Sequence, residues 1–412
     1  MSPTIAMVSE HASPLAVLGS EDAGGQNVHV AALSTALAER GHEVTVYTRR
    51  DDPDLPDRVP FAPGVTVEHL TAGPPAPVGK DDLPPHLPEL TASLRAALQR
   101  ERPELVHAHF WMSGLCSLEA TAGLDLPVVQ TFHALGTVKR REQGHDDTSP
   151  ELRIPAEHRL AREAGVIATC RDEVVELAAM GCDTERVVVV PCGVDTEVFA
   201  PLGPTRRRGE RVRLLVIGRL VRRKGLSDVL QALVDVPDVE LVVVGGPASE
   251  ALDTDRAAAR TRAEIDELGL RDRVRLFGRA SHEDVAAWIR ASDVVVCAPW
   301  YEPFGIVPLE AMACGVPVVG TAVGGLLDTV RDGRTGRLVP PRRPDLLADA
   351  LREVAADPVL RARMGAAGRR RVLSRFSWDR VAEETERAYR TLTGMGAVDR
   401  SPVTAEVEVV NL

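Results

Sequence analysis

The stretch "DVVVCAPWYEPFGIVPLEAMACGVPVVG", residues 293–320, contains the order of elements that decides the fold. A run of β-branched residues is followed by a polar loop, then by a helix-length apolar segment that ends at Gly315, and then by a second β-branched run. Two strands joined through a helix are parallel, and near-continuous apolar strands have both faces covered. This stretch therefore predicts a buried βαβ unit.

The same alternation runs along the chain in two series. The first series predicts strands at 4–9, 43–48, 105–110, 127–133, 165–170 and 186–193. The second predicts strands at 212–220, 239–247, 273–279, 293–299, 317–325 and 335–341. A Pro- and Arg-rich break at 200–211 separates them and is typical of a linker. We expect an α/β fold of two Rossmann-like, doubly wound domains, residues 1–200 and 201–380, that face a central cleft.

Composition limits the class of protein. A chain of 412 residues suits two domains, and its net charge of -11 with 3% aromatic residues argues against a nucleic-acid partner. Residues 1–14 lack a signal peptide and no apolar run is long enough for an integral membrane segment, so we expect a cytoplasmic protein. The six cysteines form no Cys-x-x-Cys pair and are predicted to be reduced. The oligomeric state is unknown from the sequence.

Ligands of such folds bind beyond the carboxyl ends of the strands, so the loops there are informative. Gly24 and Gly25 precede a helix expected at about 27–40. Glycines at a helix start let the backbone approach an anion closely and direct free N–H groups toward it. A plain strand-to-helix turn is the alternative for a single Gly-Gly pair.

Two cations follow the first strand of the second series. Arg219 comes directly after that strand, and Lys224 lies in the loop before the next helix. The chain has only three lysines, which favours a need for a compact ammonium at Lys224. Two cations at a strand's carboxyl end suit a diphosphate. Solvated surface cations are the alternative, because Arg222 and Arg223 are adjacent.

Two glutamates flank the turn in the opening stretch. Glu302 lies in the predicted loop and Glu310 in the first turns of the helix, so both can face the ligand space. A carboxylate accepts hydrogen bonds from pairs of hydroxyls, which sugars and riboses offer. The alternatives are a surface acid at Glu302 and an acid that stabilises the helix N-terminus at Glu310. Beside the two cations, the pair predicts a nucleotide-sugar site.

An ordered set of motifs from about residue 4 to 390 resembles the retaining glycosyltransferases of family 4, which have the GT-B fold. The motifs are DAGGQNVHV, HAHFWMSG, TFHALG, PCGVDTEVF, GRLVRRKG, VVVGG, LFGR, EPFGIVPLE and GGLLDTVRDGRTGRLV. The resemblance implies transfer of a hexose-type sugar, with retention and without a metal or other cofactor. The donor would be a nucleoside-diphosphate sugar, with UDP favoured and GDP or ADP open, and the acceptor a small hydroxylated, possibly phosphorylated molecule.

The resemblance also implies residue roles. Glu302 would bind hydroxyls of the transferred sugar, Glu310 the ribose, and Arg219 with Lys224 the diphosphate. The implied catalytic residues are His133, Arg219, Lys224 and Glu302. The implied donor-binding residues are Gly24, Gly25, Arg219, Lys224, Arg279, Glu302, Phe304, Gly305, Ile306 and Glu310. In this fold a C-terminal helix, here expected at 381–395, returns to the first domain, and residues 396–412 are expected to be a poorly ordered tail.

Within the family the chain is most similar to the mycothiol-pathway group that transfers N-acetylglucosamine to D-inositol 3-phosphate, and its DAGGQ motif also resembles sucrose-phosphate synthases. The implied acceptor-binding residues are His11, Asn27, Lys80, Phe110 and Arg153. Lys80 and Arg153 match the group's basic pair. Phe110 and Ala134 stand where the group has a tyrosine and a threonine, so two hydroxyl donors are missing.

Three other classes of protein compete with this interpretation. His11, His107, His109 and His133 fall at predicted strand ends, and a His-x-His pair on one strand face suits a metallohydrolase. The chain offers no matching third ligand, so no metal site is expected. A nucleotide-sugar 2-epimerase would share the fold but need no acceptor, and a non-catalytic sugar-nucleotide binding protein would keep the donor site alone.

Overall fold

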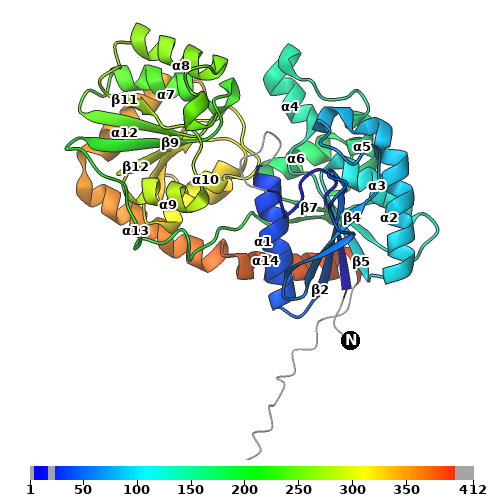
Figure 1. Ribbon diagram of the computed structural model, residues 1–412. Helices are drawn as coiled ribbons and strands as arrows, with labels where there is room; N and C mark the ends of the chain where they lie inside the picture. Colours follow the sequence, from blue (N-terminus) through cyan, green and yellow to red (C-terminus); the bar gives the residue numbers. More distant parts are fainter. Residues whose placement is uncertain (1–3, 17–23, 395–412) are drawn as a thin grey trace, which may run out of the picture.

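The computed structural model describes residues 4–16 and 24–394 and contains two separate β-sheets, each in its own domain (Figure 1). The tail expected at 396–412 and the start of the DAGGQ motif lie outside the described residues. The α/β fold with two Rossmann-like domains, expected from the sequence, is confirmed.

The N-terminal sheet has eight strands in the order β3-β4-β2-β1-β5-β6-β7-β8. Their bounds are β1 (Thr4–Val8), β2 (Glu43–Arg49), β3 (Arg58–Ala62), β4 (Val65–Leu70), β5 (Leu105–His109), β6 (Val128–Thr131), β7 (Gly165–Ala168) and β8 (Val187–Val189). All neighbours pair in parallel except β3 and β4, which form an antiparallel hairpin. The sequence reading missed this hairpin, although Pro63 and Gly64 are a turn signal between two short strands.

The C-terminal sheet has six parallel strands in the order β11-β10-β9-β12-β13-β14. Their bounds are β9 (Val212–Ile217), β10 (Val239–Val244), β11 (Val274–Leu276), β12 (Val294–Cys297), β13 (Val318–Thr321) and β14 (Gly336–Val339). Val295 of β12 lies opposite Val318 of β13, which confirms the βαβ unit that the opening stretch predicts.

Helices cover both faces of each sheet (Figure 1). The N-terminal domain contains α1 (Gly25–Glu39), α2 (Leu87–Glu101), α3 (Trp111–Thr121), α4 (Gly136–Gln143), α5 (Arg153–Glu163) and α6 (Arg171–Ala179). The C-terminal domain contains α7 (Leu226–Val234), α8 (Arg256–Glu267), α9 (His282–Arg290), α10 (Ile306–Ala313), α11 (Gly325–Thr329), α12 (Pro344–Ala356) and α13 (Pro358–Arg375). Apolar side chains on both sheet faces form separate cores, as parallel sheets require.

The last helix, α14 (Trp378–Thr393), crosses from the second domain and packs beside α1 beneath the first sheet (Figure 1). Val381 and Tyr389 of α14 are fully buried in the same cluster as Leu33 and Leu37 of α1. Arg40, just after α1, donates two hydrogen bonds to the buried Glu386 of α14, at 2.9 and 3.0 Å. The helix is therefore part of the first domain's core.

Each sheet has one topological switch point, or reversal point: successive strands are first added on one side of the first strand and then on its other side. In the first sheet this point lies between β1 and β5, and in the second between β9 and β12. Such reversals open a crevice beyond the carboxyl ends of the strands, where α/β proteins bind ligands. The residues that follow these four strands are therefore the candidates for a ligand site.

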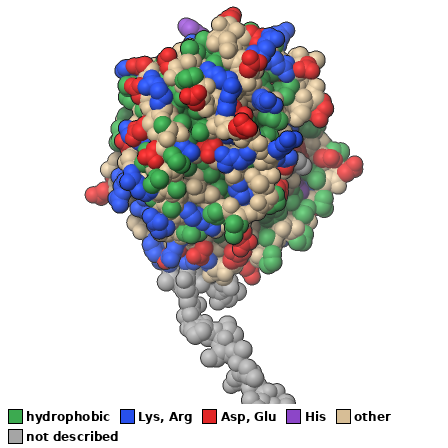
Figure 2. Space-filling view, turned by 90° about the vertical axis from the view of Figure 1, so that its left-hand side faces the viewer, with side chains coloured by type: hydrophobic (Ala, Val, Ile, Leu, Met, Phe, Trp, Pro, Cys, Tyr) green, Lys and Arg blue, Asp and Glu red, His purple; other side chains and the backbone are tan. Residues whose placement is uncertain are grey.

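Charged side chains of both signs are visible on the face of the molecule in Figure 2. Lys and Arg side chains there are interspersed with Asp and Glu, so no single-sign patch covers this face. Among the helices in the described part of the chain, none combines the length and apolar character needed to cross a bilayer.

Candidate active site

The loop after β12 meets the first domain at the glycine turn before α1. A Cβ atom on Gly25 would lie 3.2 Å from Ile306 Cδ1 and 3.7 Å from the Phe304 ring. The Phe304 ring also lies edge-on to His133, with 5.3 Å between centroids. The fold thus brings together Gly25, His133 and the 304–306 loop, which are far apart in the sequence.

Glu302 and Lys224 form an ion pair between the two elements at the second sheet's reversal point. Lys224 ends the 3₁₀ turn η5 (Arg222–Lys224) after β9, and its Nζ donates to Glu302 Oε2. Burial alone would raise the pKa of Glu302, but the Lys224 ammonium, Arg223 and the Phe304 backbone N–H together lower it below its usual value. Glu302 is therefore a carboxylate at neutral pH, held in place by a cation.

Two glycines support the loop that carries Glu302. Gly325 N donates to the Glu302 carbonyl at 2.8 Å, and a Cβ on Gly324 would lie 2.2 Å from that same oxygen. Gly324 also has a φ of +44°, which disfavours other residues. The Gly-Gly pair at 324–325 is thus required by the close approach of the loop above it.

Glu310 lies in α10, and its side chain is buried. It is 6% exposed and its carboxylate has no hydrogen-bond partner among the described residues. Burial raises the pKa of Glu310 to about 7. An unpartnered, buried carboxylate is unfavourable in a folded protein, so Glu310 is suited to accept hydrogen bonds from a ligand.

His133 stands at the end of a buried ladder of histidines. Its Nε2 lies 2.9 Å from His109 Nδ1, while His107 lies beside His109 and contacts Tyr389 of α14 through Nδ1 at 2.8 Å. His133 has a φ of +61°, which is uncommon for a residue other than glycine, and its Nδ1 is buried without a partner in the described chain.

The buried histidines His29, His107, His109 and His133 are uncharged at neutral pH. Burial lowers the pKa of His107 to about 3 and that of His29 to about 4, and burial with neighbouring histidines lowers the pKa of His109 and His133 well below the usual value. Within residues 4–16 and 24–394, no three His, Cys, Asp or Glu side chains are grouped so as to hold a metal ion. His109 Nδ1 contacts His133 Nε2, whereas His107 is held by Tyr389 and Thr131.

Arg219 and Arg279 occupy exposed positions after β9 and β11. Neither side chain has a hydrogen-bond partner in the described part of the chain. Both lie at the carboxyl edge of the second sheet, where the predicted diphosphate would be held. Their role in donor binding stays a prediction.

Arg153, predicted to bind the acceptor, is buried and fully engaged. Its Nε donates to Glu157 Oε1 at 2.7 Å and its Nη2 to the Ala134 carbonyl at 2.6 Å. Its guanidinium lies over the Phe110 ring, 5.0 Å from the centroid. The charge of Arg153 is thus balanced by Glu157 within the protein, a partner that the sequence reading missed.

Asn27 and Lys80, two further residues predicted to bind the acceptor, lie near the starts of α1 and of a short 3₁₀ turn. Asn27 Oδ1 accepts from Gly24 N at 3.0 Å and its Nδ2 donates to the Ser13 carbonyl at 2.9 Å, so the amide fixes the start of α1. Lys80 begins the short turn η1 (Lys80–Asp82), and Thr148 donates to the next residue, Asp81. This contact brings the Lys80 segment to the loop that precedes Arg153.

Comparison with known proteins assigns the chain to a family. Residues 23–198 match the family described as Glycosyltransferase Family 4, and residues 203–371 match Glycosyl transferases group 1. The chain is 39% identical to a D-inositol 3-phosphate glycosyltransferase of Xylanimonas cellulosilytica, over 92% of this chain and 94% of the relative. The chain belongs to the family 4 glycosyltransferases. The resemblance seen in its sequence motifs is confirmed.

Further relatives and solved structures support the same family. This glycosyltransferase is 39% identical to a D-inositol 3-phosphate glycosyltransferase of Geodermatophilus obscurus, over 93% of this chain and 88% of that one. Its structure is similar to the sucrose-phosphate synthase of Thermosynechococcus elongatus, with a TM-score of 0.86, 32% identity, and coverage of 95% of this chain and 99% of that one. Anabaena HepE shares the fold, with a TM-score of 0.71 at 20% identity and coverage of 95% and 99%.

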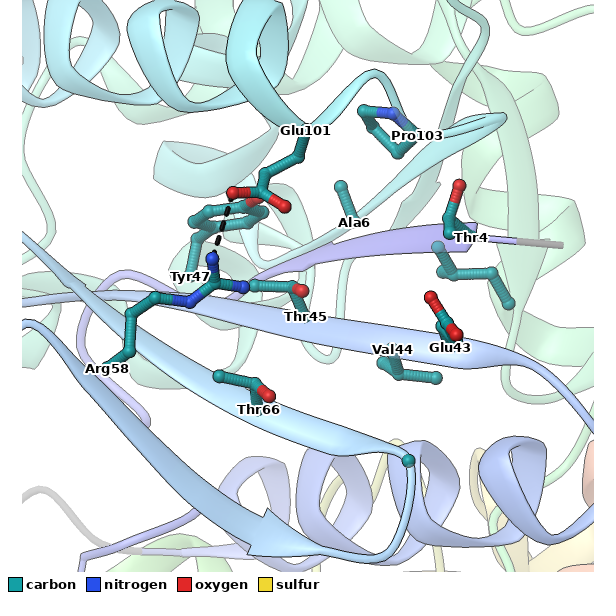
Figure 3. Close-up of a pocket in the computed structure, with 12 residues that line it drawn as sticks. Thr4, Ala6, Glu43, Val44, Thr45, Tyr47, Arg58, Thr66, Glu101 and Pro103 are labelled. Atoms are coloured by element: carbon teal, nitrogen blue, oxygen red, sulfur yellow. Dashed lines mark hydrogen bonds and ion pairs between the residues drawn. The ribbon is translucent and has the colours of Figure 1, made fainter. Parts of the chain in front are cut away.

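Two hollows of this glycosyltransferase lie away from the site. One of about 220 Å³ is lined by Thr4 and Glu43, which begin β1 and β2, and is bordered by the ion pair of Arg58 and Glu101 (Figure 3). The other, of about 600 Å³, is lined by Arg213 and Glu240 near the starts of β9 and β10. Both open at the amino ends of strands, opposite the crevices where this fold binds ligands.

Trp300 and Glu10 are two further residues near the site that sequence reasoning missed. Trp300 lies between Arg222 and Arg342, at 5.2 and 4.3 Å from ring to guanidinium, and donates to Asp228 at 2.9 Å. Glu10 lies buried next to His11. The signal in the sequence was position, since each lies in the loop that begins at the end of a buried strand, β1 or β12.

Proposed function

We propose that this glycosyltransferase moves a hexose-type sugar from a nucleoside-diphosphate sugar, with UDP as the nucleotide, to a small phosphorylated polyol. The transfer would retain the configuration at the anomeric carbon and would need no metal. The observation that carries the proposal is the Lys224–Glu302 pair at the reversal point of the second sheet, set against Gly25 and His133 of the first domain. Donor and acceptor would bind on opposite walls of this crevice.

The proposed chemistry follows from the charges at that place. Departure of the nucleoside diphosphate builds negative charge on its phosphate oxygens, and Lys224 and Arg219 supply cations at the strand ends. Charges fixed in advance lower such a barrier without reorganising during the reaction. Glu302, kept ionised by Lys224, would accept hydrogen bonds from the sugar hydroxyls.

Support for a phosphorylated acceptor comes from the relatives. The D-inositol 3-phosphate glycosyltransferases and the sucrose-phosphate synthase each carry a phosphorylated compound in their names. Thr148 connects the Lys80 segment to the loop before Arg153, so these two cations would lie on the same wall and contribute to binding the acceptor phosphate. All six cysteines are unpaired, which supports the cytoplasm as its compartment.

The test is a product assay on the purified chain. UDP-, GDP- and ADP-sugars would each be incubated with inositol phosphates, hexose phosphates and the same compounds without phosphate, with and without EDTA. We expect one UDP-sugar and a phosphorylated acceptor to give a disaccharide-like product by mass spectrometry, with the donor's anomeric configuration retained in its NMR spectrum and EDTA without effect. No product from any pair, with a folded protein, would contradict the proposal.

A further inference from the structure

A buried carboxylate stands directly behind His11. Glu10 follows β1 at the first sheet's reversal point and is 2% exposed. Its carbonyl accepts hydrogen bonds from Arg49 N at 3.1 Å and Thr48 Oγ1 at 3.5 Å, both at the end of β2. The backbone of Glu10 is thereby fixed to the neighbouring strand, and its side chain points away from bulk water.

The carboxylate of Glu10 makes two hydrogen bonds of fixed direction. Ser113 Oγ, on α3, accepts from Glu10 N at 3.0 Å, so its single proton is available to Glu10 Oε2. Glu10 Oε1 lies 2.6 Å from His11 Nδ1. Within the described chain, no lysine or arginine forms an ion pair with Glu10. A carboxylate can only accept, so a neutral His11 must carry its proton on Nδ1.

The other ring nitrogen of His11 is therefore a hydrogen-bond acceptor. The His11 side chain is 11% exposed, and its Nε2 has no partner among the described residues. The ring meets Phe110 edge-on at 5.1 Å, and Phe110 in turn lies under Arg153. His11 is thus held by Glu10 and Phe110, and Nε2 keeps one lone pair for a ligand at the predicted acceptor wall.

We propose that Glu10 is a positioning residue that fixes the tautomer of His11, so that Nε2 accepts a hydrogen bond from a hydroxyl of the acceptor. This inference rests on the proposed function. A lone pair backed by a carboxylate favours a hydroxyl, which can donate, and disfavours a phosphate oxygen, which only accepts at neutral pH. His11 would therefore contact the polyol ring of the acceptor, with the phosphate placed elsewhere.

The first test needs no activity. Long-range ¹⁵N–¹H NMR correlations of histidine-labelled protein report which ring nitrogen carries the proton. We expect His11 to be protonated on Nδ1 in the wild type. This preference should be lost in Glu10→Met, because methionine has no acceptor atom of comparable strength. It should be kept in part in Glu10→Gln. An Nε2-protonated His11 in the wild type, or one unchanged in Glu10→Met, would overturn the inference.

The second test is kinetic and uses a double-mutant cycle. Glu10→Met should lower kcat/KM for the acceptor roughly tenfold to a hundredfold, through the acceptor KM, with the donor KM unchanged, and should have no further effect in His11→Ala. Glu10→Gln should recover part of the loss. The matched control is Glu68→Gln. Glu68 is a buried carboxylate on β4 that is bound by Arg100 of α2, and its replacement should leave all kinetic constants unchanged.

The outcomes separate the two proposals. A wild type that transfers to no acceptor contradicts the proposed function, and the NMR test still decides on the Glu10–His11 pair. If the wild type is active, two results contradict this inference alone. In the first, Glu10→Met leaves the acceptor kcat/KM unchanged. In the second, Glu10→Met lowers it by the same factor in the wild type and in the His11→Ala background. If Glu10→Met does not fold, Glu10→Gln and His11→Ala carry the same cycle.

Discussion

Glu302 lies in the loop before α10 and Glu310 lies within α10, and their surroundings shift their pKa values in opposite directions. The ammonium of Lys224 and nearby donors hold the pKa of Glu302 below its usual value despite burial. Glu310 lacks such a partner, and burial raises its pKa to about 7. At the residue scale the site thus holds one permanent carboxylate and one that titrates near neutrality.

Replacing Lys224 by alanine should remove both the diphosphate cation and the partner of Glu302. We expect kcat to fall by about 10²- to 10³-fold, because charge on the leaving phosphate is no longer stabilised. Steady-state kinetics with the donor measure this. Arg337→Ala, which removes an exposed ion pair in the same domain, is the control and should keep full activity. Wild-type kcat in Lys224→Ala would contradict the donor-site assignment.

Glu310 should make stability depend on pH. Its folded-state pKa of about 7 lies above the ordinary value of 4.5, so between these pH values only the unfolded chain has lost the proton. The group's favourable contribution is complete below about pH 4.5 and is lost as pH rises to about 7. At about 1.4 kcal/mol per pKa unit, the loss is up to about 3 kcal/mol.

The measurement for Glu310 is urea unfolding of wild type and Glu310→Gln at pH 5 and pH 8. The glutamine cannot ionise, so the stability of the variant relative to wild type should rise between pH 5 and pH 8. The comparison cancels the buried histidines, which act in the opposite sense by destabilising the fold as pH falls below about 6.5. A difference that is the same at both pH values would refute the assignment.

At the scale of elements, α14 ties the second domain's end to the first domain's core. Arg40 and His42 both contact the buried Glu386. Burial alone would raise the pKa of that carboxyl, but its interactions with His42 and Arg40 lower it to about 2. Apolar contacts with α1 cover the rest of the helix. The return of this helix therefore depends on a buried polar cluster as well as on apolar packing.

Arg40→Met should leave Glu386 in a buried position with only part of its compensation. We expect a loss of about 3 kcal/mol in the free energy of unfolding, since removal of one partner from a buried ion pair is strongly destabilising. Chemical denaturation at pH 7 measures it. Arg380→Met, which removes an exposed pair on the same helix, should cost less than about 1 kcal/mol. Equal effects of the two changes would contradict this account.

At the scale of the whole molecule, polar contacts join the two domains across the crevice, in addition to the contact of the 304–306 loop with Gly25. Asp328 of α11 accepts from the Arg171 backbone N–H of α6 at 2.7 Å, and Arg342 lies 3.1 Å from Glu142 of α4. Thr169 reaches the Pro303 carbonyl at 3.4 Å. Polar contacts of this kind can break and form again, which suits domains that close on their ligands and open to release products.

Asp328→Ala should shift the molecule toward a more open arrangement, because it removes the partner of the first N–H of α6. The contact is worth roughly 1 kcal/mol, so the closed population should fall a few-fold. Small-angle scattering should report a larger radius of gyration without ligand and a return to the wild-type value with donor and acceptor. Asp345→Ala, within the second domain, is the control. An unchanged radius in Asp328→Ala would contradict the role of this contact.

The sequence by itself determined the two α/β series, the break between them, the βαβ unit around Glu302 and Glu310, and the family, because these depend on local periodicity and on motifs in fixed order. Only the tertiary structure decided how side chains are partnered. Arg153 is matched by Glu157, Glu10 stands behind His11, and the β3–β4 hairpin joins the edge of the first sheet. Arg153 and Glu157 are four residues apart on α5, and Glu10 is next to His11, so both pairs are close in the sequence. The burial that makes these pairs matter exists only once the chain is packed.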